Sequence, residues 1–217
     1  MVDEQLAGRG ITDDRVLEAM GRVPRELFVG DRDRRKAYRD MPLRIGHGQT
    51  ISQPYMVAVI CQAAEVREGD SILDIGTGSG YQAAVLSHLC RRVYTIERWR
   101  ELQKAADGRF ARLGITNVTT IIGDGWLGWP PQAPFDRIIV TAAAPEPPQA
   151  LVDQLKLGGR MILPIGESRD TQQLVQIDKT KDGLVTTDLL PVRFVPLLHG
   201  VAKDTERESF RDIGKDR

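Results

Sequence analysis

Short, mostly apolar runs separated by helical patterns fill the middle of the chain. The runs lie at residues 71–76, 92–97, 118–123, 137–141 and 159–164, and the last begins at a Gly-Gly pair that should stop the preceding helix. Such runs are typical of strands buried in a parallel sheet. The segments with helical spacing of apolar residues begin at residue 81 or span 99–112 and 149–155. This alternation predicts a doubly wound, Rossmann-like α/β sheet.

Ahead of the sheet, apolar residues predict an N-terminal helical extension. Residues 12–14 begin this helix and Pro24 ends it, with apolar positions at helical spacing at Val16, Leu17, Met20 and Val23. Residues 31–40 combine five basic residues with three aspartates. We interpret this segment as a solvated loop or helix face in preference to a nucleic-acid patch.

The pattern changes again toward the C-terminus. Residues 174–177 and 184–186 predict two strands joined by a turn at 181–183. Because no helix lies between them, we expect an antiparallel edge on an otherwise mostly parallel sheet. Residues 203–217 are mostly charged, which predicts a frayed tail or a loosely docked helix.

Composition narrows the classes of protein and of partner. The chain has 217 residues, 41% of them hydrophobic, which suits one well-buried domain. Thirty basic residues balance thirty acidic ones, so no overall field favours nucleic acid or an anionic membrane. No apolar run approaches a membrane span, and the N-terminus is acidic and polar where a secretory signal is basic and apolar. We expect a cytoplasmic protein, monomeric, without nucleic-acid or membrane partners.

Cysteine and histidine spacing indicates no metal site. Cys61 and Cys90 form no CxxC pair and lie in apolar surroundings, so we expect reduced core residues. His47, His88 and His199 are scattered and make no metal-ligand spacing.

The most informative segment is the glycine-rich turn that follows the first strand of the sheet. Glycines at positions 76, 78 and 80 let backbone approach a ligand closely. A dinucleotide fingerprint requires a further glycine at the position that Tyr81 occupies. The spacing therefore favours S-adenosylmethionine over a nicotinamide cofactor, and a ligand-free tight turn is the alternative. The expected cofactor contacts here are Asp74, Gly76, Thr77, Gly78, Ser79 and Gly80.

Glu97 ends the second predicted strand, 21 positions after Gly76. A carboxylate at this place can accept hydrogen bonds from both ribose hydroxyls of an adenosine. The alternative is a solvated strand-end glutamate.

The third and fourth strands end in small residues that should also face the cofactor. Asp124 and Gly125 follow the third strand, and Thr141 ends the fourth. Asp124 either accepts a hydrogen bond from the adenine amine or is a plain turn aspartate, and the residues alone leave both open. The Thr-Ala-Ala-Ala segment from Thr141 lacks the acid or amide followed by Pro-Pro that base-amine methyltransferases often carry, so methylation of an exocyclic amine is a minor alternative.

Together with segments upstream, these motifs resemble the protein-L-isoaspartate(D-aspartate) O-methyltransferase family. The resemblance runs from about residue 12 to residue 200. Its family-specific parts are residues 22–28, Tyr38 with Asp40, Pro42 and Leu43, and residues 46–54; its more widely shared parts are residues 74–80, 123–125, 135–143 and 157–161. Arg44 stands where many members carry proline, and the tail has no firm counterpart.

The resemblance implies a class I methyltransferase fold and a specific reaction. A methyl group would pass from S-adenosylmethionine to the free α-carboxylate of an L-isoaspartyl residue in a damaged protein or peptide, and the ester would collapse to a succinimide. Ser52 would contact the substrate carboxylate, with Gln49, Thr50 and Ile51 lining the junction of cofactor and peptide. Residues 1–70 would then be a substrate and cap segment, 71–200 the core and 201–217 a tail, within one domain.

The chemistry of this reaction agrees with the residues. A carboxylate of pKa roughly 3.5 to 4 is already ionised at neutral pH, so no general base is needed. Ser52 stands just before a predicted helix, and we expect it to be the N-cap beside the positive end of the helix dipole.

Three alternatives remain at the level of sequence. The basic segment 31–40 motivates an RNA or small-metabolite methyltransferase, while a non-catalytic S-adenosylmethionine-binding module would keep Glu97 and the glycine turn. A nicotinamide dehydrogenase is disfavoured by Tyr81. The presence of residues 50–52 argues for an enzyme.

Overall fold

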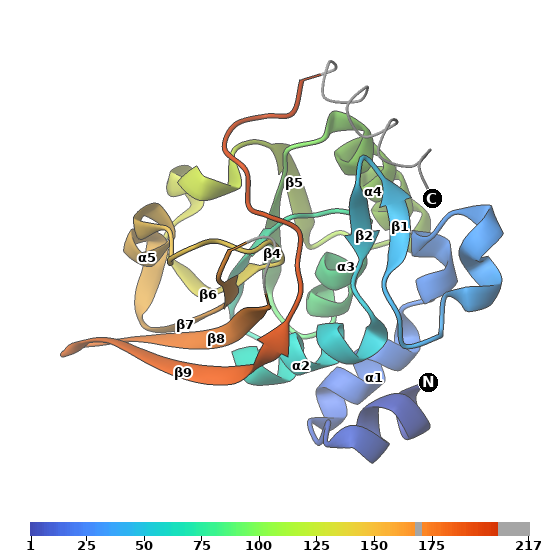
Figure 1. Cartoon of the computed structure of the whole chain (residues 1–217), viewed down its shortest axis with the longest axis horizontal. Coiled ribbons are helices and arrows are strands. Elements are labelled where there is room, and N and C mark those ends of the chain that lie inside the picture. Colours follow the sequence, from blue (N-terminus) through green and yellow to red (C-terminus); the bar gives the residue numbers. More distant parts are fainter. Residues whose placement is uncertain (168–170, 204–217) are drawn as a thin grey trace.

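A seven-stranded sheet forms the centre of the molecule in the computed structural model, which describes residues 1–167 and 171–203 (Figure 1). The strand order is β5-β4-β3-β6-β7-β8-β9. Neighbours from β5 to β7 pair in parallel, whereas β7, β8 and β9 pair antiparallel. The doubly wound sheet with an antiparallel edge is therefore confirmed. The strands are β3 (Ser71–Ile75), β4 (Arg92–Glu97), β5 (Val118–Ile122), β6 (Phe135–Val140), β7 (Leu155–Ile165), β8 (Gln172–Thr180) and β9 (Gly183–Val192).

Helices cover both faces of this sheet, and a separate two-stranded hairpin stands beside it (Figure 1). The α-helices are α1 (Asp14–Arg22), α2 (Pro54–Ala64), α3 (Tyr81–Ser87), α4 (Arg100–Leu113) and α5 (Gln149–Gln154). The hairpin consists of β1 (Leu43–Gly46) and β2 (Gln49–Ile51). Short 3-10 or π turns are η1 (Val2–Leu6), η2 (Ala7–Arg9), η3 (Arg25–Phe28), η4 (Asp31–Lys36), η5 (Gly125–Leu127) and η6 (Pro130–Gln132).

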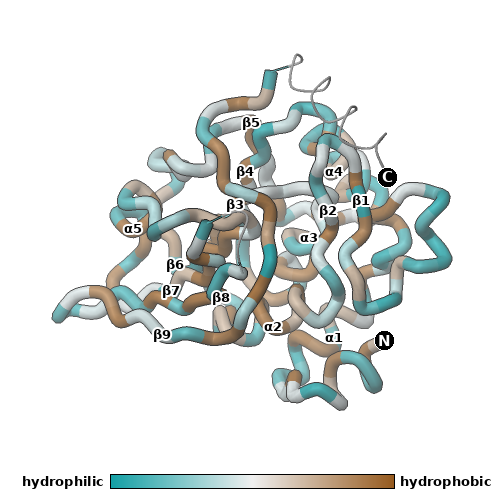
Figure 2. The backbone as a smooth tube through the Cα atoms, in the orientation of Figure 1, coloured by the Kyte–Doolittle hydropathy of each residue, from teal (hydrophilic) through white to brown (hydrophobic). Residues whose placement is uncertain are grey.

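Two hydrophobic cores sandwich the sheet. All of β3 is buried: Ile72 packs into the core that includes residues of α1 to α4, and Leu73 and Ile75 pack into the core that includes residues of α5. Figure 2 accordingly shows hydrophobic positions along the central strands. Each fully buried aliphatic side chain contributes about 1.5–3 kcal/mol. Because β3 packs into a core on each face of the sheet, the glycine turn that follows this strand is held in place from both faces.

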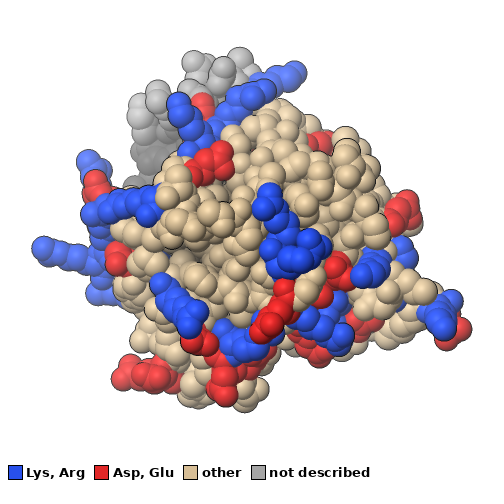
Figure 3. All heavy atoms as spheres, turned by 180° about the vertical axis from the view of Figure 1, so that it is seen from behind, with Lys and Arg blue, Asp and Glu red and all other residues tan. Residues whose placement is uncertain are grey.

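The N-terminal segment belongs to the first core, which extends from Leu6 to Val192. α1 forms as predicted: the Asp13 side chain accepts hydrogen bonds from the N–H groups of Arg15 (2.9 Å) and Val16 (3.3 Å). The basic segment forms η4, in which Lys36 pairs with Asp33 at 3.3 Å. On the face opposite Figure 1, residues of both charge signs lie side by side (Figure 3).

Two predicted details of the C-terminal half were wrong. The Gly158-Gly159 pair does not stop a helix, since α5 ends at Gln154 and β7 begins at Leu155. The pair lies inside β7 near a register shift against β6, where a Cβ on Gly159 would stand 2.8 Å from the Lys156 carbonyl oxygen. The hairpin is also longer than predicted, pairing residues 172–180 with 183–192. The tail beyond residue 203 lies outside the described residues.

Cys61 and Cys90 are buried and not disulfide-bonded, as the sequence predicted. Burial raises the pKa of the Cys90 thiol to about 12, and that of Cys61 still further, which makes both thiols poor nucleophiles. None of the helices within the described part of the chain has the length and apolarity needed to cross a membrane.

Candidate active site

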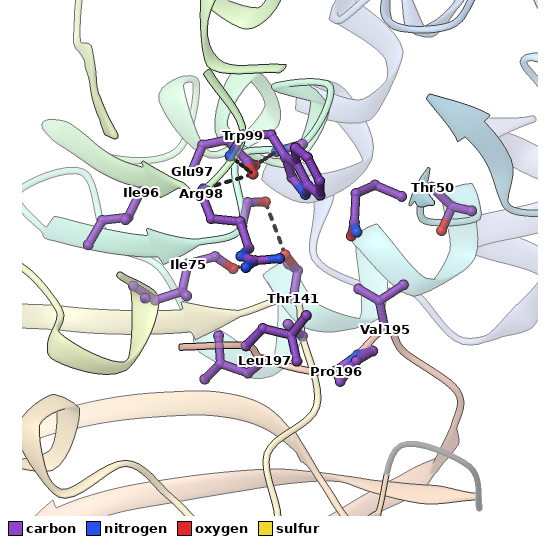
Figure 4. A pocket seen from close by; sticks show the side chains of 16 residues that line it. Thr50, Ile75, Ile96, Glu97, Arg98, Trp99, Thr141, Val195, Pro196 and Leu197 are labelled. Carbon is purple, nitrogen blue, oxygen red and sulfur yellow. Dashed lines mark hydrogen bonds between the residues drawn. The ribbon is translucent and has the colours of Figure 1, made fainter. Parts of the chain in front are cut away.

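The main cavity lies at the carboxyl ends of the central strands (Figure 4). The strand-end residues predicted to face a cofactor meet here, among them Gly76, Gly78, Glu97, Gly125 and Thr141. The cavity is also lined by residues of the β1–β2 hairpin and of a C-terminal segment, namely Gln49, Thr50, Val195, Pro196, Leu197 and Leu198. Segments from three regions of the chain therefore form one site.

The glycine turn requires residues without a Cβ. Gly76 and Gly80 have φ angles of +98° and +89°, in the left-handed region. A Cβ on Gly76 would lie 2.6 Å from Thr141 Oγ1, and one on Gly80 would lie 2.8 Å from a ring atom of Phe110. The turn can therefore pack against β6 and α4 only with glycine at these positions.

Glu97 is almost completely buried, with 5% of its surface exposed, and lines the main cavity. One carboxylate oxygen accepts a hydrogen bond from the Gly78 N–H at 2.7 Å. The other accepts from the N–H groups of Arg98 (2.9 Å) and Trp99 (3.0 Å). Burial raises the pKa of Glu97, although these backbone donors oppose the shift. The carboxylate is thus held in one orientation at the cavity wall.

Thr141 ties the end of β6 to the turn. Its Oγ1 lies within hydrogen-bond distance of the carbonyl oxygens of Ile75 (2.9 Å) and Gly76 (3.1 Å), and its N–H donates to Ile75 at 3.0 Å. Thr141 thus directly follows β6, at the carboxyl end of the strand, and lines the main cavity.

Asp74 lies behind the turn and does not line the main cavity. It is completely buried; Oδ2 accepts a hydrogen bond from Thr95 Oγ1 at 2.9 Å, and Thr95 Oγ1 lies 2.8 Å from Thr77 Oγ1. Its Oδ1 has no hydrogen-bond partner. Burial raises the pKa of Asp74 to about 7, with the nearby Glu97 charge acting in the same direction.

Asp124 has the contacts of a turn aspartate. One carboxylate oxygen accepts from the Trp126 N–H at 2.8 Å and caps η5, and the other accepts from the Gly200 N–H at 2.7 Å. Asp124 itself does not line the main cavity, whereas Gly125 does. A Cβ on Gly125 would lie 2.5 Å from Ile75, so this glycine keeps the cavity floor open.

A small cavity and a groove adjoin the main cavity. The small cavity is lined by residues 50–52, 76–79, 81 and 82, Val57 and Thr141, and the groove by Arg9, Pro42, Thr50, Thr141, Thr171 and residues 52, 53, 55, 56 and 190–195. Thr50 and Thr141 line all three. Ser52 lines the small cavity and the groove. Of the remaining predicted residues, Ile51, Thr77 and Ser79 line the small cavity, whereas Gly80 lines none of the three. The loop predicted to meet a substrate therefore lies against the glycine turn.

The prediction that Ser52 caps α2 was wrong. The N-cap residue is Gln53 and Pro54 is the first helical residue. The first-turn N–H of Tyr55 donates instead to Asp40 Oδ1 at 3.0 Å, and Asp40 also pairs with Arg9. A distant carboxylate thus takes the capping role, and the Ser52 hydroxyl is not engaged by the helix.

Residues that the sequence did not single out complete the cavity. Trp99 lines it two positions after Glu97, and the Trp99 ring lies 4.6 Å from that of His47 on the β1–β2 turn. The segment at residues 195–198 lies along Ala143, whose N–H donates to Val195 at 2.8 Å. Proximity to Glu97 was a usable signal for Trp99, whereas the C-terminal segment has no motif of its own.

Within residues 1–167 and 171–203, no three His, Cys, Asp or Glu side chains are grouped to hold a metal ion.

Comparison with protein families gives one family over most of the chain. The family model described as Protein-L-isoaspartate(D-aspartate) O-methyltransferase (PCMT) matches residues 1–202. A protein-L-isoaspartate O-methyltransferase of Parvibaculum lavamentivorans is 59% identical over 202 residues, covering 92% of this chain and 91% of that protein. One of Paracoccus denitrificans is 53% identical, covering 91% of this chain and 92% of its own.

Solved structures agree. A protein-L-isoaspartate O-methyltransferase superposes with a TM-score of 0.83 at 30% identity, over 97% of this chain and 70% of the other. A Plasmodium falciparum structure, titled as a putative protein-L-isoaspartate O-methyltransferase in complex with S-adenosyl-L-homocysteine, superposes with a TM-score of 0.79 at 31% identity, over 91% and 96%.

The raised pKa of Asp74 predicts a pH-dependent stability. In the unfolded chain this carboxyl ionises near pH 4, whereas in the folded protein it stays protonated up to about pH 7. Folding therefore takes up a proton between these values, and this contribution to stability is lost as pH rises through about 7. We expect Asp74→Asn to gain thermal stability relative to wild type from pH 4 to 7 and then to level off, by about 2–4 °C for each kcal/mol.

Thermal unfolding of both proteins across this pH range tests the prediction. Asp153→Asn, which replaces an exposed carboxylate on α5 in the same way, is the control. A flat Asp74→Asn difference would show that Asp74 is ionised in the folded protein well below pH 7.

Proposed function

The chain belongs to the protein-L-isoaspartate(D-aspartate) O-methyltransferase family, and we propose that residues 49–52 present its substrate to a methyl donor held at the glycine turn. The enzyme transfers a methyl group from S-adenosylmethionine to the free α-carboxylate of L-isoaspartyl residues in damaged proteins and peptides, which initiates repair through a succinimide. Family membership favours this activity over the RNA or metabolite methyltransferase, binding module and dehydrogenase alternatives. The site assignment rests on one observation: Thr50 and Thr141 line both the main cavity and the groove, so the two meet at these residues.

The main cavity fits an adenosyl cofactor. Gly76 and Gly125 line it, and a Cβ on either would collide with another lining residue, Thr141 or Ile75, so only glycine lets the backbone approach the cavity here. Glu97 offers a fixed carboxylate suited to a ribose diol, and Gly125 leaves room beside it for a flat base. When bound, S-adenosylmethionine supplies an electrophilic methyl group on a sulfonium. Asp74 and Asp124 support the turns around the cavity rather than line it.

The groove fits an anionic substrate. Its charged lining residues are Arg9 and Arg193, and no Asp or Glu of the described residues lines it. Arg9 pairs with Asp40, while Arg193 is exposed and in no ion pair within residues 1–167 and 171–203. A substrate carboxylate therefore meets cations and hydroxyls here, which favours its ionised, nucleophilic form.

Ser52 is the proposed catalytic contact. Asp40 accepts the hydrogen bond of the Tyr55 N–H in the first turn of α2, so this donor is not available to a substrate. The Ser52 hydroxyl, which lines the small cavity and the groove, is the proposed donor to the substrate carboxylate. Gln49, Thr50 and Ile51 line the adjoining walls. Orientation of an already ionised nucleophile is then the principal task of these residues.

We also propose a cytoplasmic monomer without nucleic-acid or membrane partners, and a single domain in which residues 1–70 form the substrate and cap segment. The shared core of Leu6 and Val192 supports one domain. The mixed charges on the face in Figure 3 give no single-sign surface for a polyanion there.

Methyl transfer from labelled S-adenosylmethionine to matched peptides containing aspartate or isoaspartate tests the activity. We expect a base-labile methyl ester on the isoaspartyl peptide alone. Equal labelling of both peptides, or labelling of neither, would contradict the assignment.

Ser52→Ala tests the substrate contact. We expect methyl transfer to fall by about 10-fold or more, as for loss of a hydrogen bond to a charged group, while the dissociation constant for S-adenosylmethionine stays within error. Ser87→Ala, on α3 and outside the three cavities, is the control. Parallel loss of transfer and cofactor binding would refute the role of Ser52.

Glu97→Ala tests the cofactor contact. The loss of a charged acceptor should weaken S-adenosylmethionine binding by about 1.5–3 kcal/mol, measured by titration calorimetry. Glu146→Ala, at an exposed site outside the cavities, should leave the affinity unchanged. An unaltered affinity in Glu97→Ala would overturn the assignment.

A further inference from the structure

Arg25 is a completely buried cation next to the site, with none of its surface exposed. Its Nε donates a hydrogen bond to the Ala37 carbonyl at 2.7 Å, and one terminal nitrogen donates to the Ser52 carbonyl at 2.6 Å. Its guanidinium carbon lies 4.7 Å from the centre of the Tyr81 ring, a cation–π distance. Arg25 lines none of the three cavities, so it acts on them only through these neighbours.

The burial of this charge is costly. Desolvation lowers the pKa of Arg25, with Tyr81 and Asp40 opposing the shift, yet an arginine remains charged in proteins. Its second terminal nitrogen has no hydrogen-bond partner, which adds to the cost. An aliphatic residue at this position would avoid both costs. The hydrogen bonds that Arg25 makes therefore indicate what a guanidinium achieves there.

Two of the residues that Arg25 contacts belong to the two halves of the site. Ser52 ends the substrate-facing loop, and Tyr81 is the first residue of α3, directly after the glycine turn. Both line the small cavity. Tyr81 is fixed in turn by an edge-on contact with Phe28, with ring centres 5.4 Å apart. A single guanidinium thus joins the main chain of Ser52 to the start of the helix that follows the cofactor turn.

We propose that Arg25 is a positioning residue for methyl transfer, which sets the Ser52 main chain, and with it the Ser52 hydroxyl, against the glycine turn. The Ser52 side chain is not fixed by a helix cap, so its place depends on the main chain that carries it. The inference rests on the proposed function of Ser52. It assigns to residue 25 a role in orientation, without contact to either substrate.

Arg25→Met should separate orientation from binding. A misplacement of about 1 Å can cost up to about 100-fold in rate, so we expect kcat for an isoaspartyl peptide to fall by about 10- to 100-fold. The dissociation constant for S-adenosylmethionine should stay near the wild-type value, because Arg25 does not line the main cavity. Arg25→Lys keeps the charge but cannot bridge two carbonyls with a planar fork, so its kcat should be intermediate.

Arg137 provides a matched control. Arg25 contacts Ser52, just before the N-terminal end of α2, and Arg137 contacts the C-terminal end of the same helix. It is also buried, and its side chain donates to the carbonyls of Ala64 (2.6 Å) and Glu65 (3.0 Å) at the C-terminal end of α2. Arg137→Met, like Arg25→Met, removes a guanidinium that donates to two main-chain carbonyls, and the loss of these donors should lower thermal stability in both variants. Below the melting temperature of each variant, however, its kcat should remain near that of wild type.

Chemical rescue gives a readout that loss of stability does not mimic. Arg25→Ala leaves a buried space the size of the side chain, and millimolar guanidinium ion added to this variant should restore part of kcat. The same ion should leave kcat of wild type and Arg137→Ala unchanged or lower it, because guanidinium is otherwise a denaturant.

The outcomes are distinguishable. A kcat of Arg25→Met equal to that of Arg137→Met, or no rescue of Arg25→Ala, would refute the positioning role while an active wild type upholds the proposed function. Wild-type protein that fails to methylate the isoaspartyl peptide would refute both.

Discussion

The hydrogen bond from the Gly78 N–H to the Glu97 carboxylate joins the two strands on which the cofactor cavity depends. The same carboxylate holds the N–H groups of Arg98 and Trp99, and so also directs the chain into α4. One buried anion thereby orders the glycine turn, the end of β4 and the aromatic wall at Trp99. Three backbone N–H donors offset the free-energy cost of burying that anion. Unlike water molecules, these donors are held in fixed positions by the fold.

The cofactor half of the site was predictable because its signals are local. A buried strand, a glycine turn and a strand-end acid each occupy a few consecutive residues, and the parallel sheet brings their ends together without further information. The register of β3 against β4 and β6 fulfils that expectation. Strand boundaries were less accurate, as in β7, because a Gly-Gly pair inside a strand with a register shift resembles a helix stop.

The parts that sequence missed depend on contacts between distant residues. Asp40 rather than Ser52 accepts a hydrogen bond from the first turn of α2. No residue near Ser52 in the sequence indicates that a carboxylate from another segment takes this place. The segment at residues 195–198 reaches the cavity by pairing with Ala143, far earlier in the sequence. The residues around Asp124 do not distinguish a cofactor contact from a turn aspartate, because its hydrogen bond from the Gly200 N–H joins segments that only the fold brings together. The family resemblance predicts residues 49–52 at the substrate junction, and these residues line cavities beside the glycine turn, whereas the capping argument for Ser52 did not hold.

The division of the site into connected cavities resolves an electrostatic conflict in the reaction. A cavity for a cationic adenosyl donor benefits from an acid such as Glu97, but the same acid would repel a substrate carboxylate. In this chain Glu97 lines only the main cavity, together with Arg98, whereas both charged residues that line the groove are arginines, without an acid among the described residues. The neutral side chains of Thr50 and Thr141 form the wall between them. The sulfonium of the donor and the carboxylate of the substrate can therefore meet at that wall. Methyl transfer neutralises both charges, and the apolar residues around the wall, including Ile75 and Val195, favour this loss of charge.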